Sequence, residues 1–131
     1  MSFSDDIRRF SEKAVKAHNA IARTATLELF SGVIKATPVD TGRARGNWQT
    51  TVGAPAKGRL EREDKSGSEA IAEVEAKTPE GAGQVTMLTN NLPYIDELEF
   101  GSSKQAPQGM VRTNLTRLQK MVDAAIRKNK V

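Results

Sequence analysis

Apolar residues near the N-terminus recur at alternating spacings of four and three. The positions are Phe3, Ile7, Phe10, Ala14, Ala17 and Ile21. This spacing puts them on one face of a helix. Thr37-Pro38 ends the pattern, because the residue before a proline avoids the helical region. We predict one helix over residues 4–36, roughly 50 Å long at 1.5 Å per residue. So long a helix outruns the core of a small domain and is expected to pack on another molecule.

The middle of the chain, residues 47–90, is expected to be rich in strands. Asn47–Val52 contains β-forming residues and places Trp48, Thr50 and Val52 on one face, which predicts a strand. A second strand is expected over 84–90. The polar, glycine-bearing segment 53–67 between them is predicted to be an exposed loop or hairpin arm.

The segment Ser68–Lys77 fits two structures. Alternating apolar positions, such as Ala70, Ala72 and Val74, are compatible with a strand. The high content of alanine and glutamate, and Ser68 as a candidate cap, favour a helix.

The C-terminal part contains a motif-rich loop over 94–109, which begins with a helical turn at Tyr94. An amphipathic helix over 110–128 follows. Together the elements predict an α+β fold in a single domain, 1–131. A long N-terminal helix and a C-terminal helix pack on a small, mostly antiparallel sheet with a short middle helix.

Composition limits the class of protein. The chain has 131 residues, 37% of them hydrophobic and 5% aromatic, so its core is lean. It contains no cysteine, which excludes disulfides and thiolate metal sites. No stretch reaches the ~20 apolar residues needed to span a membrane, and the acidic N-terminus lacks the apolar core of a signal peptide. A soluble protein without an export signal is expected.

The net charge is +4 and the isoelectric point is near 9.6. An excess of basic over acidic residues is compatible with polyanionic partners. The basic residues are nevertheless spread along the chain and mixed with acidic ones. The distribution therefore argues against a dedicated nucleic-acid binder.

The sequence contains few residues that could be catalytic. The acidic run Asp96, Glu97 and Glu99 could do acid–base work or bind Mg²⁺, but we interpret it as the solvated face of a short helix with one residue in a salt bridge. The single histidine, His18, is expected on the surface of the first helix. We therefore expect no catalytic residues, no metal, no cofactor and no enzymatic activity.

Gly42-Arg43-Ala44-Arg45-Gly46 resembles a phosphate-binding turn but lacks the Lys-Ser/Thr of a nucleotide site. We interpret it as a capped turn, with Asp40 or Thr41 as the cap and two exposed arginines available for interface or phosphate contacts. Trp48 is the only tryptophan and is expected in the core.

Two stretches carry a family resemblance. The first is Thr-Pro-Val-Asp-Thr-Gly-Arg-Ala-Arg-Gly-Asn-Trp at 37–48. The second is Asn-Asn-Leu-Pro-Tyr at 90–94, continued by Leu-Glu-Phe-Gly-Ser-Ser-Lys-Gln-Ala-Pro-Gln-Gly-Met-Val-Arg at 98–112. In order and spacing they resemble the tail-completion or minor tail (neck) proteins of long-tailed, lambda-like bacteriophages.

The resemblance implies a structural protein of the virion, assembled in the host cytoplasm and located in the neck, at the head-proximal end of the tail. It would complete the tail or join it to the head as part of a ring, expected to be a hexamer. Its partners would be copies of itself, other phage neck and tail proteins and, without sequence specificity, packaged DNA. A tail terminator, a head-side connector and a non-specific DNA-binding accessory protein stay open as alternatives.

The resemblance also implies roles for residues of the two stretches. The Asp40-Thr41-Gly42 turn would set the geometry between the first helix and the sheet, and the 99–104 loop with Tyr94 would carry structural or inter-subunit contacts. Glu99 is expected to pair with Lys104 or with an arginine. The candidate structural or interface residues are Asp40, Thr41, Gly42, Arg43, Arg45, Trp48, Tyr94, Glu99, Gly101, Lys104 and Arg112.

Overall fold

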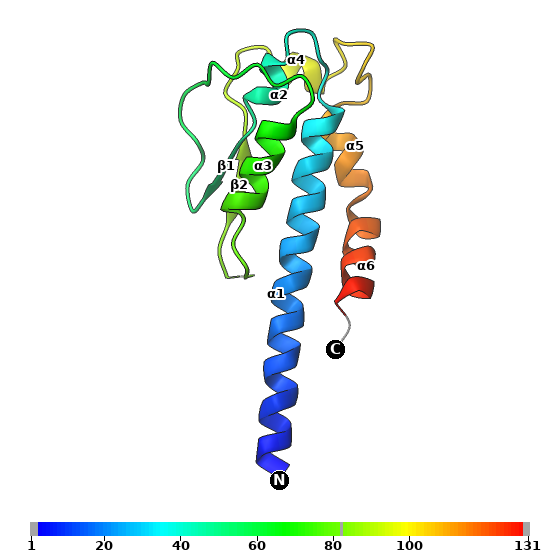
Figure 1. Cartoon of the computed structure of the whole chain (residues 1–131). Coiled ribbons are helices and arrows are strands. Elements are labelled where there is room, and N and C mark those ends of the chain that lie inside the picture. Colours follow the sequence, from blue (N-terminus) through cyan, green and yellow to red (C-terminus); the bar gives the residue numbers. More distant parts are fainter. Residues whose placement is uncertain (1–2, 82, 130–131) are drawn as a thin grey trace.

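A computed structural model of the chain describes residues 3–81 and 83–129 (Figure 1). The helices are α1 (Phe3–Ala36), α2 (Arg43–Gly46), α3 (Ser68–Lys77), α4 (Ile95–Glu99), α5 (Met110–Thr116) and α6 (Leu118–Lys128), and the strands are β1 (Gln49–Val52) and β2 (Thr86–Thr89). The α+β class and the long N-terminal helix predicted from the sequence are confirmed.

Helix α1 runs the whole length of the molecule, and its N-terminal half projects beyond the other elements (Figure 1). We call residues 4–18 the stem and the rest of the structure the body. No residue of the stem is buried, and Ile7, Phe10 and Val15 are 49%, 66% and 60% exposed. The prediction that this helix outruns the core is confirmed.

In the body, α1 lies between two groups of elements. One group comprises α3 and the strands, and the other comprises α5 and α6 (Figure 1). The buried core that joins them consists of Val33, Ile34, Trp48, Ala70, Val74 and Met110. Helix α5 approaches α1 closely at Gly32, where a Cβ atom would lie only 2.2 Å from Oδ1 of Asn114.

The strands form an antiparallel pair in which Gln49 is opposite Thr89 and Val52 is opposite Thr86. Both are shorter than predicted. The first begins two residues late because Asn47 ends α2, where its backbone N–H donates to the carbonyl of Ala44. Of the three residues predicted to share one face, Trp48 and Thr50 are buried, whereas Val52 at the end of the strand is 41% exposed.

The ambiguous segment Ser68–Lys77 is a helix, as its composition favoured. Its cap differs from the prediction. Ser68 is the first helical residue and does not cap. Instead the carboxylate of Asp64 accepts a hydrogen bond from the backbone N–H of Ala70 at 2.9 Å, which satisfies one of the free N–H groups of the first turn.

The predicted exposed loop 53–67 is exposed over most of its length, but Asp64 and Gly67 are buried. From Leu60 onward it is bound to the body: the buried amide of Asn47 exchanges hydrogen bonds of 2.7 and 3.0 Å with the backbone of Leu60. The guanidinium of Arg62 donates to the carbonyls of Gly46 and Trp48 at 2.7 and 3.0 Å. An exposed loop was predicted because the segment is polar. Polar side chains, and not apolar ones, hold it to the body.

The predicted C-terminal helix over 110–128 is divided at Arg117 into α5 and α6. The N–H of Arg117 bonds the carbonyl three residues back, on Asn114, at 3.1 Å. Thr116 and Asn114 also direct their side chains to backbone carbonyls of the preceding turn. Such side-chain bonds compete with the regular helical ladder, which explains the interruption.

Candidate assembly interface

The two sequence motifs meet at the end of the body opposite the stem. We call this region, formed by residues 37–48 and 90–112, the motif end. It contains α2, α4 and the loops at the top of Figure 1. The amide of Asn90 donates to the carbonyl of Ala44 at 2.9 Å, so the start of the second motif is bonded directly to the centre of the first.

The first motif begins with a buried junction between α1 and the sheet. The hydroxyl of Thr37 donates to the carbonyl of Val33 at 2.7 Å and accepts from the indole Nε1 of Trp48 at 2.8 Å. Thr37 is fully buried and Trp48 is 6% exposed. The core position predicted for Trp48 is confirmed, and its N–H has the partner that a buried indole needs.

Arg45 is not the exposed arginine that the sequence suggested. Its guanidinium is half-buried and donates to three backbone carbonyls, those of Thr37 at 2.9 Å, Lys65 at 2.7 Å and Lys35 at 2.7 Å. Two of these carbonyls lie at the C-terminal end of α1, where helical carbonyls lack partners and the dipole favours a cation. Arg45 therefore stabilises the end of α1 and is not available for phosphate.

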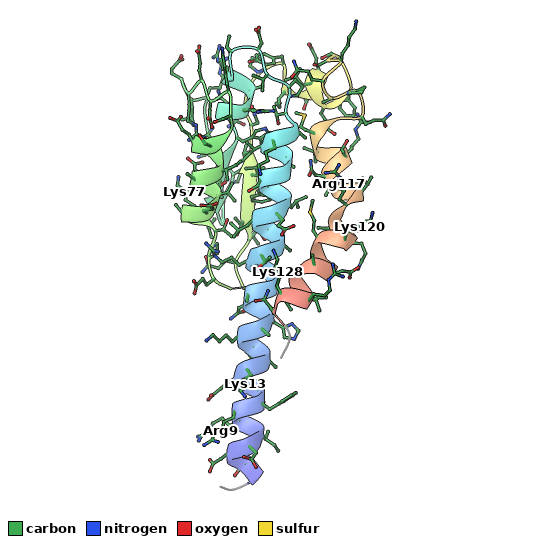
Figure 2. All side chains as sticks on the ribbon, turned by 45° about the vertical axis from the view of Figure 1, so that its right-hand side comes forward. Arg9, Lys13, Lys77, Arg117, Lys120 and Lys128 are labelled. Carbon is green, nitrogen blue, oxygen red and sulfur yellow. The ribbon has the colours of Figure 1, made fainter. Side chains whose placement is uncertain are left out.

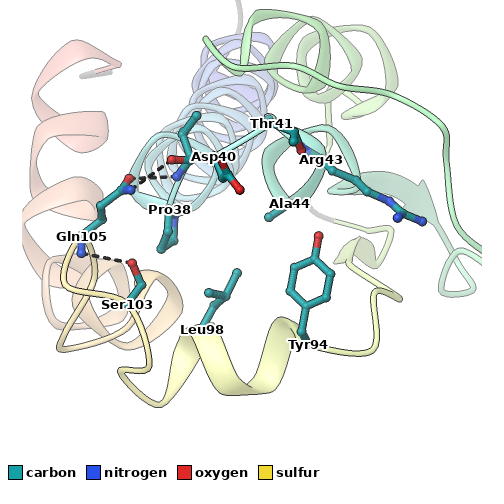
Figure 3. A pocket seen from close by; sticks show the side chains of 11 residues that line it. Pro38, Asp40, Thr41, Arg43, Ala44, Tyr94, Leu98, Ser103 and Gln105 are labelled. Carbon is teal, nitrogen blue, oxygen red and sulfur yellow. Dashed lines mark hydrogen bonds between the residues drawn. The ribbon is translucent and has the colours of Figure 1, made fainter.

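Arg43 is also half-buried, so the prediction of two exposed arginines is wrong for both. Of the two predicted caps of α2, Asp40 and Thr41, only Thr41 bonds the start of the helix, and the N-cap position belongs to Gly42. Thr41 accepts a hydrogen bond from the N–H of Arg43 through its hydroxyl, at 3.2 Å. Asp40 lies beside them at the rim of the turn (Figure 3).

Gly42 is required by both its conformation and its surroundings. Its φ angle of +89° belongs to the left-handed region, which favours glycine. A Cβ atom would lie 2.5 Å from the backbone nitrogen of Lys65, and the carbonyl of Gly42 accepts from the N–H of Asp64 at 2.9 Å. Gly42 thus lets the docked loop lie against the turn between α1 and α2.

A cavity of about 240 Å³ lies between the two motifs. Figure 3 shows Asp40, Thr41 and Arg43 from one side of it and Tyr94 and Leu98 from the other. Gln105 holds the two sides together, because its amide accepts from the N–H of Val39 at 2.8 Å and donates to the carbonyl of Val39 at 3.0 Å. Gln105 could not be singled out from the sequence, since a polar loop residue carries no periodic signal.

Glu99 forms the second anchor of the motif end. Its carboxylate accepts hydrogen bonds from the backbone N–H groups of Val111 at 2.7 Å and Arg112 at 3.0 Å, and from Nε of Arg112 at 3.0 Å. It therefore caps the first turn of α5. The predicted pairing of Glu99 with an arginine is confirmed, and Lys104 is not the partner.

Burial raises the pKa of the Glu99 carboxyl, but the hydrogen bonds from Val111 and Arg112 and the positive charge of Arg112 outweigh this effect. The net pKa lies below its ordinary value. A carboxyl with a lowered pKa in the folded state stabilises that state above its unfolded pKa of about 4.3, and this stabilisation is lost as the pH falls through the folded pKa.

Replacing Glu99 with glutamine is expected to lower the free energy of unfolding by about 2 kcal/mol at pH 7, because an amide group cannot accept from all three donors. The difference from wild type should be constant above about pH 5 and shrink toward pH 3. Urea unfolding followed by circular dichroism between pH 3 and 7 measures it. Glu97→Gln, on the same short helix but exposed, is the matched control, and an equal effect of the control would contradict the capping role.

The outer surface of the motif end carries exposed aromatic rings. Phe100 is 73% exposed and Tyr94 is 36% exposed. The guanidinium of Arg112 lies over the ring of Phe100, 5.1 Å from its centre, which is the geometry of a cation–π contact. Gly101, with a φ angle of +92°, turns the chain after Phe100, and Lys104 is exposed in the loop that follows.

The carboxylates of α4 are either exposed or already hydrogen-bonded. Asp96 and Glu97 are exposed on α4, and the carboxylate of Glu99 is occupied by three donors. Within residues 3–81 and 83–129, no cluster of three histidine or acidic side chains could hold a metal ion. Among the helices described, none is long and apolar enough to cross a membrane.

Comparisons with known proteins do not assign the chain to a family. It matches no protein-family model, no curated protein and no solved structure. The functional conclusion therefore depends on the geometry of the motif end and of the stem.

Proposed function

We propose that this protein is a structural component of the virion of a long-tailed bacteriophage. It acts in the neck, at the head-proximal end of the tail, where it completes the tail or joins it to the head as part of a ring. In this role it needs no catalytic residues, metal or cofactor.

The observation that carries the proposal is the construction of the motif end. Two segments far apart in the sequence are held together by the contacts of Gln105 with Val39 and of Asn90 with Ala44. Gln105, which is exposed, and Asn90, which is half-buried, thus fix the shape of a surface that presents Phe100 to the outside and Tyr94 at the wall of the cavity. A rigid surface with exposed aromatic rings is typical of a protein–protein interface.

The stem provides a second and different surface at the other end of the molecule (Figure 1). Contacts between unlike surfaces of identical subunits are head-to-tail, and they close into a ring when the rotation between subunits permits it. A chain with two distinct exposed ends is therefore suited to ring assembly.

Contact with packaged DNA is a subsidiary part of the proposal. Figure 2 shows Lys120 and Lys128 on α6 and Arg117 at the junction between α5 and α6. Helix α6 has Asp123 as its one acidic residue, although Lys128 already pairs with Glu28 at 3.3 Å. Such residues can neutralise phosphates without reading the base sequence.

The proposal predicts the phenotype of a phage with a stop codon in this gene. Lysates viewed by electron microscopy should contain full heads beside separate tails, and a plasmid copy of the gene should restore joined particles. A copy with Phe100→Asp should restore them at least tenfold less well, whereas Glu97→Gln should restore them fully.

The other outcomes separate the alternatives. Tails of uncontrolled length would identify a tail terminator, and tail-less heads that lose their DNA would favour a head-side connector. Normal infectious particles would contradict a structural role and would favour the DNA-binding accessory protein. That alternative predicts salt-sensitive affinity of the isolated protein for DNA.

A further inference from the structure

The stem carries an apolar seam that no other part of the described chain covers. Ile7, Phe10, Ala14 and Ala17 alternate at spacings of three and four, which is the spacing of core positions in helices that pack side by side. Ile7 is 49% exposed and Phe10 is 66% exposed. The seam is thus shaped to pack against another helix.

The body contains an apolar groove of about 390 Å³. Its walls are α1, β2 and α5, and Trp48 forms part of its floor. The lining residues are Leu29, Phe30, Val33, Trp48, Thr86, Met87, Leu88, Thr89, Val111 and Leu115. None of them is charged, so an occupant of the groove must present an apolar face.

The groove continues as an apolar stripe along the C-terminal helices. Leu115, Leu118 and Ile126 are 49%, 37% and 44% exposed, and Val111 and Val122 extend the same series at spacings of three and four. At 1.5 Å per residue, the stripe from Val111 to Ile126 is about 22 Å long and the stem seam from Ile7 to Ala17 is about 15 Å long. The stripe is therefore long enough to cover the whole seam.

The seam and the groove cannot meet within one molecule. Leu29 in the wall of the groove and Phe10 in the seam belong to the same continuous helix, α1. Their separation of nineteen residues corresponds to about 28 Å along its axis. Any contact between seam and groove is therefore a contact between two molecules.

We propose that the stem of one copy packs into the groove of a second copy, with its seam against α5 and α6 of that copy. One contact of this kind covers both large apolar surfaces, whereas pairing of two stems would leave the groove and the stripe exposed. The inference builds on the proposed ring and assigns the two faces of its head-to-tail contact.

Cysteine cross-linking tests this placement directly, because the chain contains no cysteine of its own. Phe10→Cys and Leu115→Cys are made in separate chains, one of them carrying a mass tag, and mixed under oxidising conditions. We expect a mixed disulfide at least tenfold more abundant than the one between Phe10→Cys and Val85→Cys. Val85 is 62% exposed directly before β2 and does not line the groove. A dominant Phe10→Cys homodimer would show stem–stem pairing and overturn the inference.

Charge substitutions provide a second measurement. Phe10→Glu and Leu115→Glu should each weaken self-association at least tenfold in sedimentation experiments, while Val85→Glu should not. A mixture of the two weakened variants retains one intact seam and one intact groove, so it should form dimers but no larger rings. Unchanged association of both variants would contradict the inference.

The failure of this inference is distinguishable from failure of the proposed function. Self-association that is insensitive to both substitutions, together with full heads beside separate tails in the stop-codon phage, would overturn only the stem–groove contact. Normal particles in that phage would overturn the proposed function even if the cross-link forms.

Discussion

Replacing Trp48 with alanine is expected to lower the free energy of unfolding by about 4 kcal/mol. The indole is almost fully buried in the core with Val33, Ile34 and Met110, so truncation leaves a large cavity. It also removes the donor to the hydroxyl of Thr37, which joins the start of the sheet to the end of α1. Urea unfolding followed by circular dichroism measures the loss.

Trp48→Phe separates the two contributions. Phenylalanine keeps most of the apolar volume but lacks the N–H group, so a loss of about 1–2 kcal/mol is expected. If the alanine variant were no less stable than the phenylalanine variant, the indole would not be part of the core, and the packing described for α1 against the sheet would be wrong.

Replacing Arg45 with alanine is expected to lower the free energy of unfolding by about 3 kcal/mol. Three carbonyls lose their donor, and two of them lie at the end of α1, where no helical N–H is available. The fluorescence of Trp48, the only tryptophan, reports unfolding of this variant in urea.

Arg45→Lys is the informative companion substitution. Lysine keeps the charge near the end of α1 but cannot reach three carbonyls in the planar geometry of a guanidinium. It should recover less than half of the loss. Full recovery would mean that the positive charge, and not the hydrogen-bond pattern, stabilises this junction. Arg9→Ala, on the exposed stem, is a control that should change stability by less than about 0.5 kcal/mol.

The helices were predictable because their signals are periodic. The length of α1 follows from its apolar spacing and from Thr37-Pro38, and both agree with the structure to within one residue. The division of the last helix at Arg117 was not predictable, since the apolar stripe continues across it. The decisive interactions there are local side-chain bonds of Asn114 and Thr116.

The two segments of the candidate site could be identified in the sequence. That they form one surface could not be predicted. The order of the motifs identified Gly42, Trp48 and Glu99, each of which has a defined structural role. The residues that unite the segments, such as Gln105 and Asn47, are polar and isolated in the sequence. Their importance comes from partners that only the folded chain brings near, which is also why Arg45 looked like an exposed cation.

The continuous helix α1 has a mechanical consequence. Between Ser4 and Ser31 it contains neither glycine nor proline, so it has none of the usual points at which a helix bends. It therefore forms a straight arm that contacts with α3, α5 and α6 hold in the body. A small tilt of the helix within these contacts displaces the tip of the stem by a much larger distance. The diameter of any ring built through the stem would then depend on how tightly the body holds α1, including the close approach of Gly32 to Asn114.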